Sequence, residues 1–173
     1  MTTDWFSTAQ CLGYVAFILG VGSFLQTDDK RFKLFMTGEC IAYVVHFALL
    51  GNPTATASSA VSTVRSFLAM WTRSLWVVGA VLSTNIGFGL AIATKWSDWL
   101  PLTASCLGTV ALFLMRGIPM RLVMLCGTGF WIANNLIVGS IGGTALEVVV
   151  AATNTATIVR MARARSAIRS SEG

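Results

Sequence analysis

Hydrophobic residues in this chain fall into seven long stretches separated by short polar connections. The stretches cover residues 5–25, 34–50, 53–70, 74–94, 99–115, 120–138 and 141–160. A helix needs roughly 17–25 mostly apolar residues to cross about 30 Å of hydrocarbon. The pattern therefore predicts an all-α integral membrane protein with seven transmembrane helices.

Composition excludes the alternative of a soluble domain. Hydrophobic residues make up 55% of the chain and charged residues only 11%. Soluble domains carry about 25% charged residues and use them to cover their surfaces. Too few charges remain here for such a surface.

Basic residues are concentrated on alternate connections and on the tail. One side of the predicted membrane holds Lys30, Arg31, Lys33, Arg73, Arg116, Arg121, Arg160, Arg163, Arg165 and Arg169, and the other side holds Lys95. Basic residues in short loops are retained in the cytoplasm, so we predict a multi-pass membrane protein with its N-terminus outside and its C-terminus cytoplasmic. The net charge of +5 then needs no nucleic-acid partner, because no second basic or aromatic platform accompanies the tail. A cleavable signal peptide begins with a positively charged region, and this chain has Asp4 there instead. We therefore predict that its first hydrophobic stretch is not a cleavable signal.

The two halves of the chain resemble each other. Residues 11–19 are similar to 106–114, and residues 45–51 are similar to 133–139. The two spacings differ by the length of an extra cytoplasmic segment, 26–32, where an insertion costs little. We therefore predict two parallel three-helix bundles, 1–73 and 98–160, joined by a linker transmembrane helix, 74–97, and followed by a basic cytoplasmic tail, 161–173. Parallel repeats of this kind place solute sites between the halves near the membrane midplane.

Five short segments of the chain resemble the YgjV-type family of bacterial inner-membrane proteins. They are residues 46–51, 64–66, 72–76, 120–121 and 139–144. This resemblance implies a location but no chemistry. More remotely, the three-one-three helix plan is similar to the SWEET, PQ-loop and PnuC transporters, which implies a SWEET-like fold. The chain departs from that group because it has no Pro-Gln pair, and Pro53, Pro101 and Pro119 fall near predicted helix starts, where proline bends nothing.

Arg65 is the most costly residue to place in a membrane. Counted from the outer turns it lies roughly 18 Å deep, at nearly the level of Glu39. An arginine at the centre of a transmembrane helix costs about 2.5–3.5 kcal/mol, so it faces protein or water or reaches the interface. Ser58, Ser62 and Ser66 share its helix face. Arg65 and Ser62 are therefore candidate substrate-binding residues, and the alternative is a structural ion pair between Arg65 and Glu39.

Further polar residues lie in the second predicted bundle. Asn154 matches Arg65 in depth, and we predict that it binds substrate together with Asn134 and Trp131; the alternative is ordinary helix contact. Deep in the membrane the Glu147 carboxyl should resist ionisation, which suits a proton carrier. His46, the only histidine, is its candidate proton-coupling partner, although a lone histidine near a helix end is often a packing residue.

Enzymatic chemistry finds little support in the sequence. The chain has a single histidine, and its four cysteines are not spaced as metal ligands are. We therefore predict no metal site, no cofactor and no enzyme activity. We predict a transporter of a small polar solute, with anionic and zwitterionic solutes as candidates. The competing hypothesis is a non-transporting structural, sensor or assembly-partner protein. The predicted partners are the lipid bilayer and a small-molecule solute, with a homo-oligomer left open.

Overall fold

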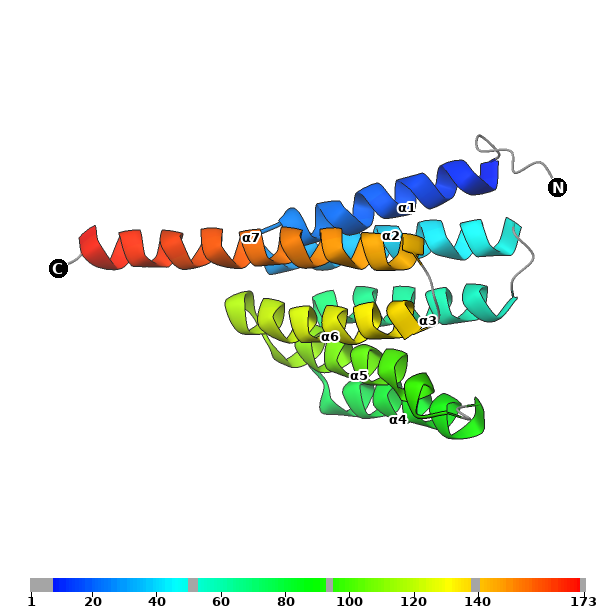
Figure 1. Cartoon of the computed structure of the whole chain (residues 1–173). Helices are drawn as coiled ribbons and strands as arrows, with labels where there is room; N and C mark the ends of the chain where they lie inside the picture. The colour runs from blue at the N-terminus through cyan, green and yellow to red at the C-terminus, as the bar shows by residue number, and fades with distance from the viewer. Residues whose placement is uncertain (1–7, 50–52, 93–94, 138–140, 172–173) are drawn as a thin grey trace. The chain divides into compact units, whose positions relative to one another are not determined.

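The computed structural model describes residues 8–49, 53–92, 95–137 and 141–171 (Figure 1). These ranges form seven α-helices and one short 3-10 helix: α1 (Thr8–Leu25), α2 (Asp29–Leu49), α3 (Pro53–Trp71), α4 (Leu75–Ile92), η1 (Trp96–Asp98), α5 (Trp99–Leu114), α6 (Gly117–Ile137) and α7 (Ile141–Ser171). The prediction of an all-α protein with seven helices is confirmed over the described residues. Residues 5–7, 50, 93–94 and 138 of the predicted stretches lie outside them.

All three prolines lie at helix starts. Pro53 is the first residue of α3, and Pro101 and Pro119 lie in the first turns of α5 and α6. The first-turn N–H groups of a helix have no intrahelical acceptor, so proline is tolerated there. The predicted position of the prolines is confirmed.

The start of α2 corrects the sequence prediction. α2 begins at Asp29 rather than at residue 34 because Asp28 caps it: the Arg31 backbone N–H donates to Asp28 Oδ1 at 2.8 Å. Such a cap satisfies an N–H group that otherwise has no partner. Lys30, Arg31 and Lys33 therefore lie in the first turns of α2 and not in a connection.

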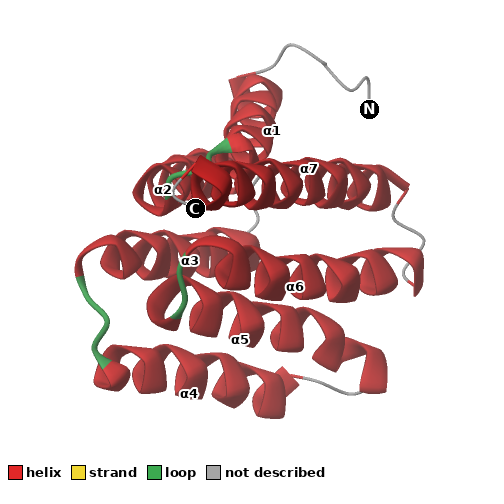
Figure 2. Ribbon diagram, turned by 90° about the vertical axis from the view of Figure 1, so that its left-hand side faces the viewer, coloured by secondary structure: helices red, strands yellow, loops and turns green. Residues whose placement is uncertain are grey.

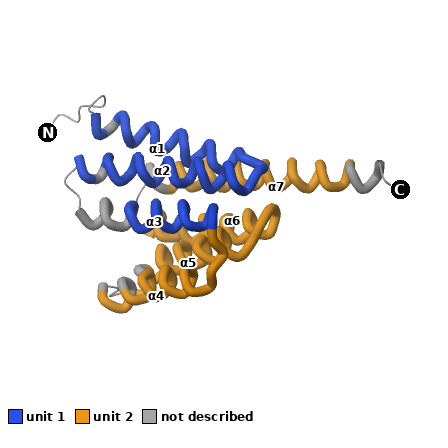
Figure 3. The backbone as a smooth tube through the Cα atoms, turned by 180° about the vertical axis from the view of Figure 1, so that it is seen from behind, with its two compact units in different colours: residues 1–71 blue, residues 72–173 orange. Residues whose placement is uncertain are grey.

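The last helix is also longer than predicted. α7 continues to Ser171 rather than ending at residue 160, so the predicted tail is helical as far as the structure describes it. Residues 160–171 are rich in alanine and arginine, which favour helix, and contain neither glycine nor proline. At 1.5 Å per residue the 31 residues span about 46 Å. Its C-terminal part extends past the start of α6 (Figure 3).

The chain divides into two compact units, Met1–Trp71 and Thr72–Gly173 (Figure 3). In the first unit α2 packs against both α1 and α3. In the second unit α6 packs against both α5 and α7, and α4 packs against α5 (Figure 2). Ser105 Oγ on α5 donates to Asn85 Oδ1 on α4 at 3.0 Å and ties these two helices together. Each unit thus has one set of three consecutive helices with the second in the middle.

Polar side chains are buried while many large apolar side chains are exposed. The fully buried residues include Arg121, Asn154, Thr157 and Ser66, whereas Trp76 on α4 is 91% exposed. Water-exposed proteins seldom bury charged side chains fully or expose so many large apolar ones. Among residues 8–49, 53–92, 95–137 and 141–171, no helix combines the length and the apolar character that crossing a membrane requires.

Candidate functional site

A polar cluster joins the three helices of the first unit. The Cys40 thiol on α2 lies beside the Ser66 hydroxyl on α3 and within electrostatic reach of both Glu39 and Arg65. Ser66 is fully buried, and so is the Nε atom of Arg65. The Glu39 carboxylate packs against α1, where a Cβ atom built on Gly20 would lie 2.8 Å from Oε1. The absence of a side chain at position 20 lets the carboxylate approach the α1 backbone this closely.

The structure brings Glu39 and Arg65 into the same small region. Both charges act on the thiol of Cys40, which contacts Ser66 where α2 packs against α3. Ser62 lies one turn before Ser66 on α3 and is half-buried. The side chain of Ser58 lies outside the described residues. The ion pair between Glu39 and Arg65 and the alternative substrate-binding role of Arg65 both stay predictions.

His46 ties α2 to α1. Its Nδ1 donates to the Ala9 carbonyl oxygen at 2.6 Å, and a Cβ built on Gly13 would lie 3.0 Å from its Cε1. The Tyr43 ring meets it edge-on with the ring centroids 6.2 Å apart. Because a carbonyl oxygen only accepts, the proton of this contact sits on Nδ1. The proton-coupling role of His46 stays a prediction.

In the second unit Asn154 is buried between α7 and α6. Its Nδ2 donates to the Arg121 carbonyl oxygen at 2.9 Å. Asn134 and Trp131 lie further along α6, about 20 Å and about 15 Å from Arg121 at 1.5 Å per residue. Asn134 is half-buried and Trp131 is 38% exposed. The structure therefore does not place Asn154 beside the other two predicted substrate-binding residues.

Glu147 lies on α7 two turns before Asn154 and is half-buried. It belongs to the second unit, whereas its predicted partner His46 belongs to the first. The predicted chamber that joins Arg65 and Asn154 also draws on both units. These pairings across the two repeats stay predictions.

Two buried cations were missed by the sequence prediction, which placed Lys33 and Arg121 in connections. Lys33 is 5% exposed, and its Nζ donates to the Ala69 carbonyl oxygen in the last turn of α3 at 2.8 Å. Arg121 is fully buried in α6. The positive-inside rule assigns both residues to a side of the membrane. It does not say where a helix begins, so it cannot distinguish a basic residue in a loop from one in the first turns of a helix.

The repeat spacing holds the signal that would have found these cations. The spacing that aligns residues 45–51 with 133–139 also pairs Lys33 with Arg121 and Ser66 with Asn154. All four of these side chains are buried. Each unit therefore buries a cation on its middle helix and a polar residue on its third helix at matching positions.

Comparisons with known proteins confirm the family resemblance. Residues 7–165 match the family described as bacterial inner membrane protein, Imp-YgjV. Over 147 residues the chain is 37% identical to the inner membrane protein YgjV of Escherichia coli (strain K12). This alignment covers 85% of this chain and 79% of the E. coli protein. No solved structure matches the chain. The chain therefore belongs to the YgjV family of bacterial inner membrane proteins.

Proposed function

We propose that this protein is a multi-pass transporter that carries a small anionic or zwitterionic solute across the inner membrane. In this proposal the seven helices span the bilayer as two parallel repeats, with the N-terminus outside and the C-terminus in the cytoplasm. The one-sided distribution of arginine and lysine supports the orientation. The many exposed apolar side chains support contact with lipid.

The polar cluster around Arg65 is the observation that carries the proposal. A guanidinium and a carboxylate lie on neighbouring helices, beside a buried hydroxyl and a thiol, and Arg65 is the only charged residue of α3. Charged groups at such positions are costly and are typical of substrate and ion pathways. A guanidinium offers paired N–H donors that match a carboxylate, and hydroxyl groups complete the binding of polar solutes. We infer that Arg65 binds the anionic group of the solute.

A second function, a non-transporting structural or assembly protein, has its own support. His46, Lys33 and Asn154 each donate to a main-chain oxygen of a neighbouring helix. Such bonds hold helices in one arrangement. A bundle in which all polar groups serve this purpose would not move solute.

Uptake into proteoliposomes distinguishes the two functions. The purified protein is reconstituted and exposed to three radiolabelled solutes. Succinate is an anion, glycine is a zwitterion and glucose is uncharged. Transport predicts uptake of succinate or glycine above that of empty vesicles, and Arg65→Gln should abolish it. Arg73→Gln, which removes an exposed arginine, is the matched control and should keep full uptake. Vesicles that take up none of the three would favour the second function.

A double variant separates binding from ion pairing. If Arg65 serves only to neutralise Glu39, the combined Glu39→Gln and Arg65→Gln variant should transport as well as the wild type. If Arg65 binds the solute, the double variant should stay inactive although its thermal stability recovers. Uptake and the unfolding midpoint are therefore measured on the same preparations.

A further inference from the structure

Glu39 and Arg65 place one negative and one positive charge in a part of the first unit that is otherwise uncharged. No other acid, lysine or arginine occurs in α1, in α3 or in α2 after Lys33. Both side chains are half-buried, so each keeps part of its surface exposed. Both lie within electrostatic reach of the Cys40 thiol at the contact of α2 with α3. The first unit therefore offers a solute two opposite charges in one small region.

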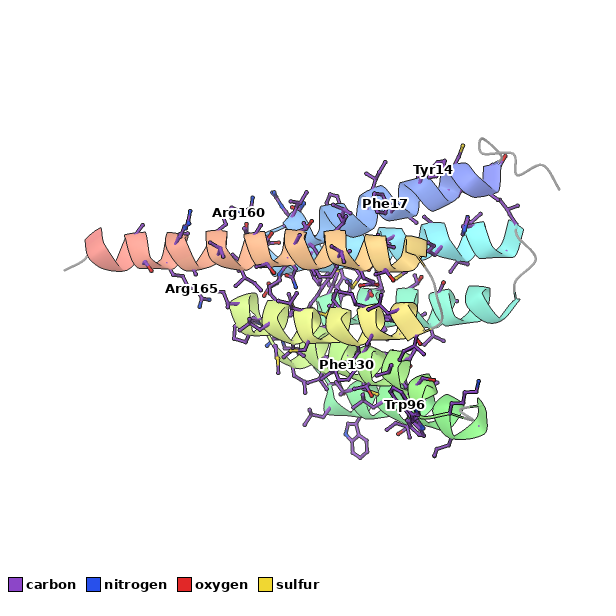
Figure 4. All side chains as sticks on the ribbon, viewed as in Figure 1. Tyr14, Phe17, Trp96, Phe130, Arg160 and Arg165 are labelled. Atoms are coloured by element: carbon purple, nitrogen blue, oxygen red, sulfur yellow. The ribbon has the colours of Figure 1, made fainter. Side chains whose placement is uncertain are left out.

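The neighbouring helix α1 sets the position of the Glu39 carboxylate. α1 packs along α2 (Figure 4), and a Cβ atom built on Gly20 would lie 2.8 Å from Oε1 and 3.0 Å from Cδ of Glu39. The carboxylate thus fills the space that a side chain at position 20 would take. Because the carboxylate is the far end of a flexible side chain, a methyl group at position 20 would displace the charge at little cost to the fold.

The sum of the charges decides which solute this pair of side chains favours. Charges in surroundings of low dielectric constant are costly unless each has an opposite partner. Together with a bound anion the two side chains carry a net negative charge, and together with a bound cation they carry a net positive one. A zwitterion brings one charge for each side chain, so the solute and the two residues stay neutral together.

We propose that Glu39 determines specificity by binding the ammonium group of a zwitterionic solute whose carboxylate binds Arg65. An ammonium group has three N–H donors that a carboxylate accepts, and the forked N–H groups of a guanidinium match the carboxylate of the solute. Neither charge recurs at the matching positions of the second unit, so the pair is specific to the first. This specificity presupposes the proposed transport function and narrows its substrates to small amino acids.

Uptake of matched solute pairs into proteoliposomes tests the role of Glu39. Glycine is compared with glycolate and L-alanine with L-lactate, because within each pair a hydroxyl group replaces the ammonium while the carboxylate stays. The wild type should take up each amino acid at least about tenfold faster than its hydroxy acid, which is the effect of one lost hydrogen bond between charged groups. Succinate is the fifth solute and reports transport of a simple anion.

Three variants assign the specificity to the Glu39 carboxylate. Glu39→Gln removes its charge at nearly equal size, so it should lower amino-acid uptake about tenfold and leave hydroxy-acid uptake unchanged or higher. Gly20→Ala keeps both charges and displaces the carboxylate, so it should lower the same ratio of uptake rates. Gly38→Ala is the matched control and should keep the ratio, because its Cβ would meet Leu19 Cδ1 at an ordinary contact distance of 3.6 Å. The ratio does not depend on how much of a variant is folded.

The contrary outcomes separate this specificity from transport itself. Hydroxy acids taken up by the wild type as fast as amino acids, or succinate taken up in preference to the other four solutes, would leave transport standing and overturn the choice of a zwitterion. A wild-type ratio in either Glu39→Gln or Gly20→Ala would show that the carboxylate does not bind the ammonium group. Uptake of none of the five solutes would reject transport, and the assigned role of Glu39 with it.

Discussion

Replacement of Lys33 by methionine should destabilise the first unit. The Lys33 ammonium is almost fully buried and donates to the Ala69 carbonyl oxygen at 2.8 Å. Because α3 ends at Trp71, this carbonyl is one of the last four of the helix and has no intrahelical N–H partner. Lys33→Met keeps an unbranched side chain that is one heavy atom shorter, and it removes the donor together with its charge.

The magnitude follows from the contact that is lost. A hydrogen bond to a charged group contributes about 1.5–3 kcal/mol, and a cation at a helix C-terminus contributes about 0.3–1 kcal/mol more. The methionine offsets part of this because no ammonium has to be removed from solvent. We therefore expect a net loss of about 2 kcal/mol, which lowers the unfolding midpoint of a chain of this length by about 4–8 °C.

The assay is thermal unfolding in detergent, with Lys30→Met as the matched control. Lys30 lies on the same turn of α2, and its ammonium lies 5.0 Å from the centroid of the Trp71 ring. An exposed contact of this kind is worth about 0.5–1 kcal/mol, so Lys30→Met should cost less than half as much. Equal midpoints for Lys33→Met and wild type would refute the capping role of Lys33. Equal losses in the two variants would show that only general charge matters.

Two further substitutions test other contacts of the structure by the same unfolding assay. Asp28→Ala should lower the free energy of unfolding by about 1 kcal/mol because the N–H of Arg31 loses its acceptor, while Asp28→Asn should stay near wild type. An Asp28→Ala variant as stable as the wild type would mean that α2 does not need its cap. Asn154→Ala removes a fully buried bond between α7 and α6 and should cost about 1–2 kcal/mol. The exposed neighbour Thr155→Ala is its control, and a larger loss there would contradict the assignment.

The positions of the helices could be predicted because apolar runs and connections alternate clearly. Pro53 and the polar turn before Leu75 bound α3 and α4 close to where the pattern ends. The start of α2 could not be found by hydropathy, since Asp29, Lys30 and Arg31 look like a loop. Only the capping geometry of Asp28 explains why these charged residues are helical.

The candidate site could be predicted only in part, for a similar reason. The sequence indicates that Arg65 and Glu39 lie at one depth, and the structure gathers them around Cys40. The sequence gives no sign that Asn154 contacts the start of α6 at Arg121, far from Asn134. Counting residues along a helix gives the depth of a side chain in the membrane and nothing more. Its neighbours depend on how the helix is rotated about its own axis, and that rotation is set by packing against the other helices.

The repeat also separates two kinds of buried charge. The cation on the middle helix occurs in both units, as Lys33 and Arg121, so it belongs to how each unit is built. Glu39 and Arg65 have no charged counterparts, because the same spacing pairs them with Gly127 and Thr153. Gly127 is buried where a Cβ would lie 3.5 Å from the Ala104 oxygen, so the second unit fills with close backbone packing the place that holds a carboxylate in the first. A three-helix unit of this type thus folds without that pair of charges. Because the second unit does without these two charges, which are costly to bury, they are not required by this architecture, and this supports the proposed solute-binding role of Arg65.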